Sequence, residues 1–254
     1  MKKSLEILAT GPFTAEQTTV AITGHLPPPP EILDRIEALW DDYMLAASRD
    51  GRMLFNSSVA CLKSAAVSNG ILSLELAATD YKTFLVTTLR DRAWFEVNSP
   101  AAMTPALGNS ILLTHGDMAY LGVRSNRVAA YPHWAHLFGG VLDWPTHWNN
   151  RAEMLLEHLY KELEEELGLA RDDLAAPPYV LALMRDPILA QPELVWRGKL
   201  KHPLTVRTHA LSADEHDAIL AVPMAAVLTA SPPATPVSRA AIAMAYQPSD
   251  NAIL

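Results

Sequence analysis

The chain has 254 residues, half of them hydrophobic and 19% charged, which predicts a globular fold with a sizeable core rather than a disordered chain. Its formal net charge of −8 argues against a general surface for nucleic acid or for an anionic membrane. Cys61 is the single cysteine, which excludes an intrachain disulfide and cysteine-based metal sites. No apolar stretch approaches the roughly 20 residues of a membrane span, so we expect a protein of the cytoplasm.

The first hundred residues predict a region that mixes helix and strand. Apolar side chains recur at helical spacing after a run of four prolines, and Leu72, Leu74 and Leu76 alternate with polar residues as in a half-buried strand. The predicted elements are strand- and turn-like residues 1–30, a helix at 31–48, strands at 54–62 and 71–78 joined by a hairpin turn at 69–70, and a short helix at 81–94.

The rest of the chain continues this mixture without a regular alternation of strand and helix. The predicted elements are a hairpin at 111–123, a glutamate-rich helix that ends at Gly168, strands at 179–184, 193–200 and 218–227, and a closing helix at 237–246. Pro223 confines the last strand to a sheet edge or ends it early. This pattern indicates the α+β type of α/β fold, a mixed sheet with helices packed around it. We predict a smaller N-terminal α+β domain at 1–106 and a second domain at 107–254.

Three glutamates near Gly168 form the most informative group. Glu162 and Glu166 are four residues apart, so they lie on one face of a helix, and Glu165 borders that face. Carboxylates this close repel one another and raise one another's pKa unless a cation lies among them. Hard oxygen ligands suit Mg²⁺ or Mn²⁺, although such a run taken alone is more typical of a solvated helix face.

The residues around these glutamates resemble the Nudix box, G-x5-E-x7-R-E-U-x-E-E-x-G-U with U aliphatic. From Glu153 onward every position matches except Lys161, which stands where the box has arginine. Gly140 resembles the box glycine, but twelve residues rather than five separate it from Glu153, an insertion of seven. The segments LPPPPEILDRIEALW, LGVRSNRVAAYP and RDPILAQPELVW are also similar to one Nudix branch, the UDP-sugar diphosphatases of the UDP-glucose type.

The resemblance implies a Nudix-like sheet between helices and an enzyme that splits a diphosphate by attack of water on phosphorus. It implies that Glu162, Glu165 and Glu166 bind Mg²⁺, with Mn²⁺ as an alternative. Glu166 is expected to orient or deprotonate the water as well, a role that the sequence does not separate from Glu162. Glu153 and Lys161 are expected to pair and to brace the box.

Four residues ahead of the helix are predicted to bind substrate. Arg124 and Arg127 would offset the phosphate charge beside the glutamates, with a plain surface role as the alternative. Gly139 and Gly140 would let the backbone approach the ligand, with a simple glycine turn as the alternative.

Further polar residues admit two interpretations each. A zinc site is conceivable for three histidines, but packing or solvent-exposed roles fit their irregular spacing better: His133, His136 and His147. Glu215 is either a late catalytic carboxylate or, as we favour, an acid in the first turn of a short helix capped by Ser212.

The leading hypothesis is metal-dependent cleavage of UDP-glucose or UDP-galactose into UMP and a sugar 1-phosphate. One alternative is a non-catalytic Nudix-like nucleotide-binding module, motivated by the insertion and by Lys161. Another is a diphosphatase for ADP-ribose or a different nucleoside diphosphate derivative, because box chemistry is shared while specificity depends on loops. In each case the partner is a small molecule, with no nucleic acid and no membrane, and the oligomeric state stays open.

Overall fold

The computed structural model describes residues 4–51, 54–128, 130–144, 152–204 and 215–246. The strands are β1 (Glu6–Phe13), β2 (Thr18–His25), β3 (Ser58–Ser68), β4 (Ile71–Asp80), β5 (Gly108–His115), β6 (Met118–Arg124), β7 (Ala135–His136), β8 (Phe138–Val141), β9 (Tyr179–Arg185), β10 (Pro192–Lys199) and β11 (His216–Pro223). The helices are α1 (Leu33–Arg49), α2 (Tyr81–Phe84), α3 (Arg92–Asn98), α4 (Glu153–Leu167) and α5 (Pro236–Ala245).

The larger sheet is mixed, as predicted. Its strand order is β1-β9-β10-β5-β6-β11, with β7 paired to β6 and β8 paired to β5. β10 and β5 run parallel, while the other pairs in this sheet are antiparallel. β11 lies at one end of this order, so the strand that ends at Pro223 is an edge strand, as the proline indicated.

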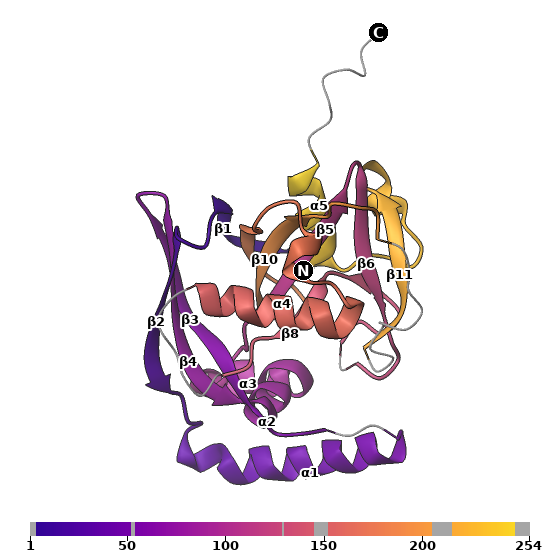
Figure 1. The fold of residues 1–254 in the computed structure, drawn as a ribbon. Helices are drawn as coiled ribbons and strands as arrows, with labels where there is room; N and C mark the ends of the chain where they lie inside the picture. Colours follow the sequence, from indigo (N-terminus) through magenta and orange to yellow (C-terminus); the bar gives the residue numbers. More distant parts are fainter. Residues whose placement is uncertain (1–3, 52–53, 129, 145–151, 205–214, 247–254) are drawn as a thin grey trace.

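Helices cover both faces of this sheet, because neighbouring side chains of each strand point to opposite sides. Ile111 and Leu113 of β5 pack in one core cluster with the buried leucines of α4. Leu112, between them, packs in a second cluster with Val237 and Ile242 of α5. Figure 1 shows α4 crossing in front of the larger sheet. The expected arrangement of a mixed sheet between helices is therefore confirmed.

The N-terminal part of the chain builds a second, three-stranded sheet with the order β2-β4-β3. Figure 1 shows it beside the larger sheet, with α1 along the bottom of the view. Ile36 and Trp40 of α1 pack against Leu85, Val86 and Phe95 in a cluster of their own. Leu72, Leu74 and Leu76 of β4 pack instead in the core beneath α4. The apolar core is therefore continuous between the smaller sheet and the larger one.

The division of the chain near residue 106 stays a prediction. Strand β1 lies in the larger sheet, where it pairs antiparallel with β9, although it comes first in the chain. Ala60 also donates a backbone hydrogen bond to Leu142 at 2.8 Å, and Leu107 donates one to Ala60 at 2.8 Å. The two sheets are therefore joined through backbone contacts as well as through side chains.

Three local expectations need correction. The segment 81–94 is α2, a π-helical turn (Leu85–Arg90) and α3 rather than one helix, and Asp91 separates the last two. Gly139 and Gly140 lie within β8 rather than in a turn. Glu215 lies in a turn directly before β11 instead of in a helix, and its expected cap Ser212 is outside the described residues. Within those residues no helix is long and apolar enough to cross a membrane.

Candidate active site

Helix α4 carries two of the predicted metal ligands toward the larger sheet. Leu155, Leu159 and Leu163 recur at intervals of four and are buried in the core, which fixes the rotation of the helix. Glu162 and Glu166 lie beside this apolar stripe, and Glu166 is only 1% exposed. The helix ends at Gly168, which adopts the left-handed conformation (φ 64°) that glycine takes without strain.

Gly139 of β8 holds one oxygen of Glu166. Its backbone N–H donates to Glu166 Oε2 at 3.1 Å. Its φ of 122° favours glycine, and a Cβ at this position would lie 2.4 Å from the carbonyl oxygen of Asn109. Gly140 is next to Glu162, because a Cβ there would lie 3.5 Å from the Glu162 carboxylate oxygens. The two glycines therefore let the β8 backbone lie directly against both carboxylates.

Two neighbouring residues at the start of β11 complete the cluster: Glu215, for which a catalytic role was the less favoured interpretation, and His216, which was not predicted from the sequence. His216 Nε2 lies 3.2 Å from Glu166 Oε1, and both side chains are buried. One ligand atom from each of Glu166, Glu215 and His216 lies within 4.8 Å of the others. The ring of His216 fits because β6 has Gly122 beneath it, where a Cβ would lie 2.4 Å from Nδ1. These three residues form a compact set of oxygen and nitrogen donors.

The electrostatics of the cluster favour a bound cation or a retained proton. Burial, followed by the charges of Glu166 and Glu215, raises the pKa of Glu162 to about 8. Burial, followed by the charge of Glu215, also raises the pKa of Glu166 well above its usual value. Burial and then Arg124 lower the pKa of His216 to about 4, so this imidazole is neutral and available as a ligand near neutral pH. The donor set therefore fits a divalent cation.

His158 is a further buried group beside this cluster. It lies one helical turn before Glu162 on α4, and its Nε2 is 3.3 Å from Glu162 Oε1. Its Nδ1 lies 3.4 Å from the amide nitrogen of Asn109, whose Oδ1 accepts a hydrogen bond from Trp196 Nε1 at 2.8 Å. His158 therefore lies between Glu162 and Asn109 of the sheet. The spacing of four residues between His158 and Glu162 was the signal in the sequence.

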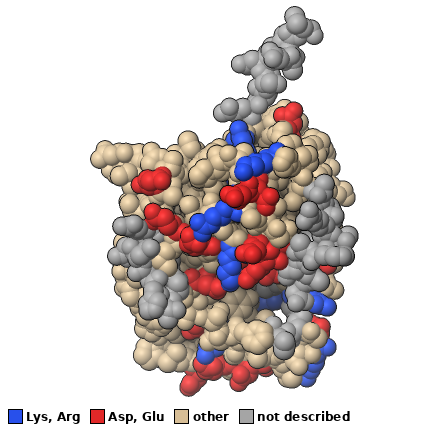
Figure 2. All heavy atoms as spheres, in the orientation of Figure 1, with Lys and Arg blue, Asp and Glu red and all other residues tan. Residues whose placement is uncertain are grey.

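The exposed side of α4 differs from the expected arrangement. Glu165 is 57% exposed, and its Oε2 lies 3.7 Å from Lys161 Nζ, which is 4.0 Å from Asp143. Glu153 is exposed and forms no ion pair with Lys161 in the part of the chain that the structure describes, so the expected brace is not formed. The two residues are eight positions apart, or roughly 12 Å along a helix. Figure 2 shows acidic and basic side chains interleaved over this face.

A cavity of about 820 Å³ opens in front of the cluster, between the larger sheet and the N-terminal helices. Its lining includes Arg124, Arg127, both glycines of β8, Glu215 and His216 on the sheet side, and Tyr43, Tyr81 and Phe84 on the other. Arg124 is held by a hydrogen bond from its Nε to the Ala130 carbonyl at 3.0 Å. Burial lowers the pKa of Arg124, and the charges of Glu193, Glu215 and Glu166 oppose that shift. The structure thus brings the predicted arginines and glycines to one cavity.

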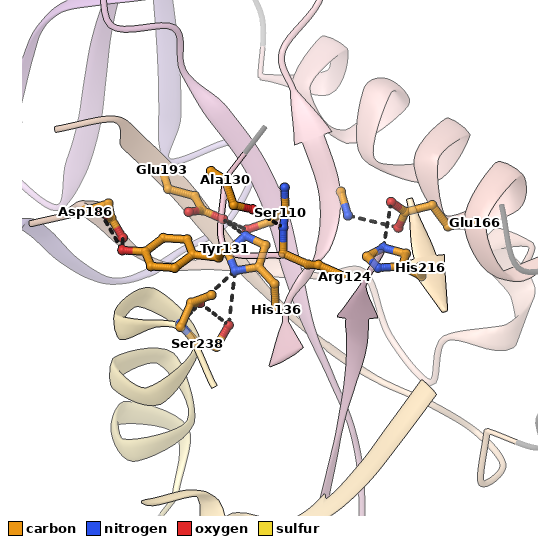
Figure 3. Close-up of polar contacts among 12 residues, drawn as sticks. Ser110, Arg124, Ala130, Tyr131, His136, Glu166, Asp186, Glu193, His216 and Ser238 are labelled. Atoms are coloured by element: carbon orange, nitrogen blue, oxygen red, sulfur yellow. Dashed lines mark hydrogen bonds and ion pairs between the residues drawn. The ribbon is translucent and has the colours of Figure 1, made fainter. Parts of the chain in front are cut away.

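A second polar network lies on the wall of the same cavity (Figure 3). Ser110 Oγ donates to Glu193 Oε1 at 2.6 Å, and His136 Nε2 lies 3.1 Å from that oxygen. His136 Nδ1 is 2.8 Å from Thr235 Oγ1. Burial raises the pKa of Glu193, but His136, Ser110 and Arg124 outweigh it, so the net pKa is lowered.

The three histidines considered for zinc do not come together among the described residues. His136 belongs to the Glu193 network, whereas His133 is 68% exposed and lies 3.9 Å from Asp217. His147 falls outside the described residues. The packing and exposed roles that were favoured for them agree with the positions of His133 and His136.

Comparison with known proteins gives a likeness to solved structures alone. No protein-family model matches the chain, and no curated protein matches it. One similar structure is a MutT NUDIX hydrolase from Burkholderia pseudomallei, 19% identical, which covers 56% of this chain and 99% of that one with a TM-score of 0.42. Another is a hydrolase of the NUDIX family from Clostridium perfringens, 12% identical, with coverages of 57% and 100% and a TM-score of 0.36. Identities and TM-scores at this level do not assign the chain to a family.

Proposed function

We propose that this protein is a metal-dependent diphosphatase of the Nudix type. The observation that carries the proposal is the cluster of Glu162, Glu166, Glu215 and His216, in which Glu166 and His216 are buried and Glu215 is exposed, beside a cavity that Arg124 lines. Hydrolysis of a phosphoric anhydride needs one group of residues to hold a cation and another to hold the phosphates beside it. Carboxylates whose pKa is raised can hold the cation, and a fixed guanidinium can hold the phosphates. The substrate we propose is a nucleotide sugar of the UDP-glucose or UDP-galactose type, cleaved to UMP and a sugar 1-phosphate.

Glu162 and Glu166 would hold Mg²⁺ or Mn²⁺, with Glu215 and His216 on the opposite side and Glu165 at the exposed rim. A cation bound there supplies polarisation of the phosphoryl oxygens and lowers the pKa of a coordinated water. Before a cation binds, Glu166 is held on both oxygens, by Gly139 N–H and by His216. We assign proton transfer from water to Glu166 or Glu162.

Arg124 and Arg127 would bind the diphosphate in the cavity. Arg124 is pre-positioned by the Ala130 carbonyl and lies close enough to Glu166 and Glu215 for their charges to affect its pKa. A guanidinium held this way needs little reorganisation to meet phosphate oxygens. The volume of about 820 Å³ suits a ligand larger than the diphosphate, and Tyr43, Tyr81 and Phe84 offer apolar and aromatic surface to a base or sugar ring.

The proposal is tested by incubating the full chain with Mg²⁺ or Mn²⁺ and a panel of nucleoside diphosphate derivatives. UDP-glucose should yield UMP and glucose 1-phosphate in equal amounts, as measured by chromatography. Turnover of ADP-ribose but not of nucleotide sugars would refute the proposed substrate and support the proposed diphosphatase reaction. Tight binding of a nucleotide without turnover, at any metal and pH tested, would refute the enzyme hypothesis and support a nucleotide-binding module.

A further inference from the structure

Glu193 of β10 is a buried carboxylate that metal-assisted hydrolysis does not use. Its Oε1 accepts a hydrogen bond from Ser110 Oγ at 2.6 Å and lies 3.1 Å from His136 Nε2. Its Oε2 receives no hydrogen bond from any residue that the structure describes. Because Glu193 lines the cavity, a ligand there can reach this carboxylate. A carboxylate has about four acceptor positions, so capacity remains after its protein contacts are made.

The network behind Glu193 holds it in place and keeps it ionised. Thr235 Oγ1 is 2.8 Å from His136 Nδ1 and accepts from the Ser238 N–H at 3.3 Å, so its hydroxyl can donate to Nδ1. That bond leaves the imidazole hydrogen on Nε2, directed at Glu193. The contacts extend from α5 through β7 to β10, and they orient the carboxylate before any ligand arrives.

The position of Glu193 relative to the metal-binding carboxylates follows from strand pairing. Ser110 and Gly139 are Cα partners of the antiparallel pair β5 and β8. Ser110 binds Glu193, and Gly139 binds Glu166 of α4, so the two carboxylates are held at paired positions of one sheet. Figure 3 shows Arg124 between Glu193 on one side and Glu166 with His216 on the other. A diphosphate on Arg124 would place the group attached to it near Glu193.

The charge of Glu193 limits which chemical group attached to the diphosphate can bind beside it. An ionised carboxylate repels phosphate oxygens and accepts hydrogen bonds from hydroxyl groups, often two at once. We propose that Glu193 determines substrate specificity by accepting hydrogen bonds from ring hydroxyls of a sugar that adjoins the diphosphate. This inference rests on the proposed function for the identity of the ligand. The sugar has two sources, the ribose of the nucleotide and the hexose beyond the diphosphate.

Binding calorimetry on the metal-free full chain separates these sources. One arm compares UDP-glucose with its analogue that lacks the ribose 2′-hydroxyl, and the other compares it with analogues that lack single hexose hydroxyls. In one of the two arms, the wild-type protein should bind UDP-glucose about 10- to 100-fold more tightly than the analogue that lacks the hydroxyl, as expected for a hydroxyl that donates to a charged acceptor. In Glu193→Gln that ratio should fall below about 5, because the bond is no longer charge-assisted.

Two controls distinguish ligand contact from a structural role. Ser238→Ala removes two hydroxyl contacts of the same network, with Thr235 and with His136, without changing the cavity lining, and it should keep the wild-type ratio. Glu164→Gln removes an exposed carboxylate of α4 and should also keep it. If Glu193→Gln does not fold, Glu193→Asp keeps the charge, withdraws the carboxylate by one methylene group, and should lower the ratio in the same arm.

The outcomes separate this inference from the proposed function. Three results would overturn the role of Glu193. The first is a wild-type ratio near one in both arms, and the second is no binding of any ligand. The third is a ratio that Ser238→Ala lowers as much as Glu193→Gln does. Turnover is measured separately with Mg²⁺ or Mn²⁺. Binding that depends on Glu193 without turnover would refute the diphosphatase and leave the hydroxyl contact standing.

Discussion

Glu166 Oε1 and His216 Nε2 lie 3.2 Å apart, although 50 positions separate the two residues in the chain. His216 is neutral near neutral pH, because burial and then Arg124 lower its pKa to about 4. The Nε2 atom of a neutral imidazole can donate its hydrogen to Glu166 or, as a bare nitrogen, bind a cation, but not both at once. Metal binding at this cluster is therefore expected to exchange one contact of His216 for another.

Replacement of the two buried glutamates should abolish turnover while the fold is kept. Glu162→Gln and Glu166→Gln each remove a charge that would hold the cation, and we expect kcat to fall by about 10²- to 10⁴-fold. Melting temperatures should not fall, because each change removes a buried charge. Glu164→Gln, on the exposed side of the same helix, is the matched control and should keep full activity. Wild-type rates in both buried variants would refute the metal assignment.

Stability of the metal-free protein should fall as pH rises from about 6.5 to about 8, because below about 6.5 the lowered pKa of His216 opposes the effect of Glu162. The folded-state pKa of Glu162 is raised from 4.5 to about 8, chiefly by burial. Between about pH 6.5 and 8 the folded state binds more protons than the unfolded state, so the free energy of unfolding decreases with increasing pH. Thermal melts across this range should show the decrease, Glu162→Gln should flatten it, and Mn²⁺ should reverse it. A metal-free stability that rises with pH through this window would contradict the environment described for Glu162.

Loss of the His216 imidazole should weaken metal binding. His216→Ala removes a nitrogen donor and the contact that fixes Glu166, and we expect Mn²⁺ affinity to fall by about 10- to 100-fold. Isothermal titration with the metal alone measures this without relying on turnover. His216→Asn supplies a shorter polar donor and should recover part of the affinity. Equal affinities for the wild type and His216→Ala would show that His216 is a packing residue.

Adjacent glycines of β8 should respond differently to the same substitution. Gly139→Ala would place a Cβ 2.4 Å from the Asn109 carbonyl at a φ of 122°, and we expect a loss of at least about 2 kcal/mol in the free energy of unfolding. Gly140→Ala meets only the Glu162 carboxylate at 3.5 Å, an ordinary contact, so the fold should be kept. Urea denaturation distinguishes the two. Equal stability of both variants would contradict the close approach of β8 to β5 at Gly139.

The elements of the fold were predictable where periodicity is strong. The alternation of Leu72, Leu74 and Leu76 predicted strand β4, and the glutamate-rich run that ends at Gly168 predicted helix α4. Local patterns of this kind report which face of an element is buried. They also gave the mixed sheet between helices, because strands and helices intermix without regular alternation.

The site was predictable only in its local half. The spacing of Glu162 and Glu166 is a property of one helix, and the structure places both against the two glycines of β8, which line the cavity. His216 meets Glu166 because β11 pairs with β6 in a register that sets His216 opposite Arg124, and no sequence pattern specifies that register. Glu193 reaches Ser110 through the parallel pairing of β10 with β5. Long-range strand pairing therefore decides the part of the site that spacing does not reveal.

Strand β1 has a consequence for how the protein is made. It pairs with β9, and its Glu6 bonds to Arg185, 179 positions later in the chain. At about 5 to 20 residues per second, a ribosome takes roughly 10 to 35 seconds to supply that partner. During this interval β1 has no partner strand, so its backbone hydrogen-bonding groups are unpaired. Pro12, which offers no backbone N–H, and the charge of Glu6 are features that discourage pairing with other nascent chains.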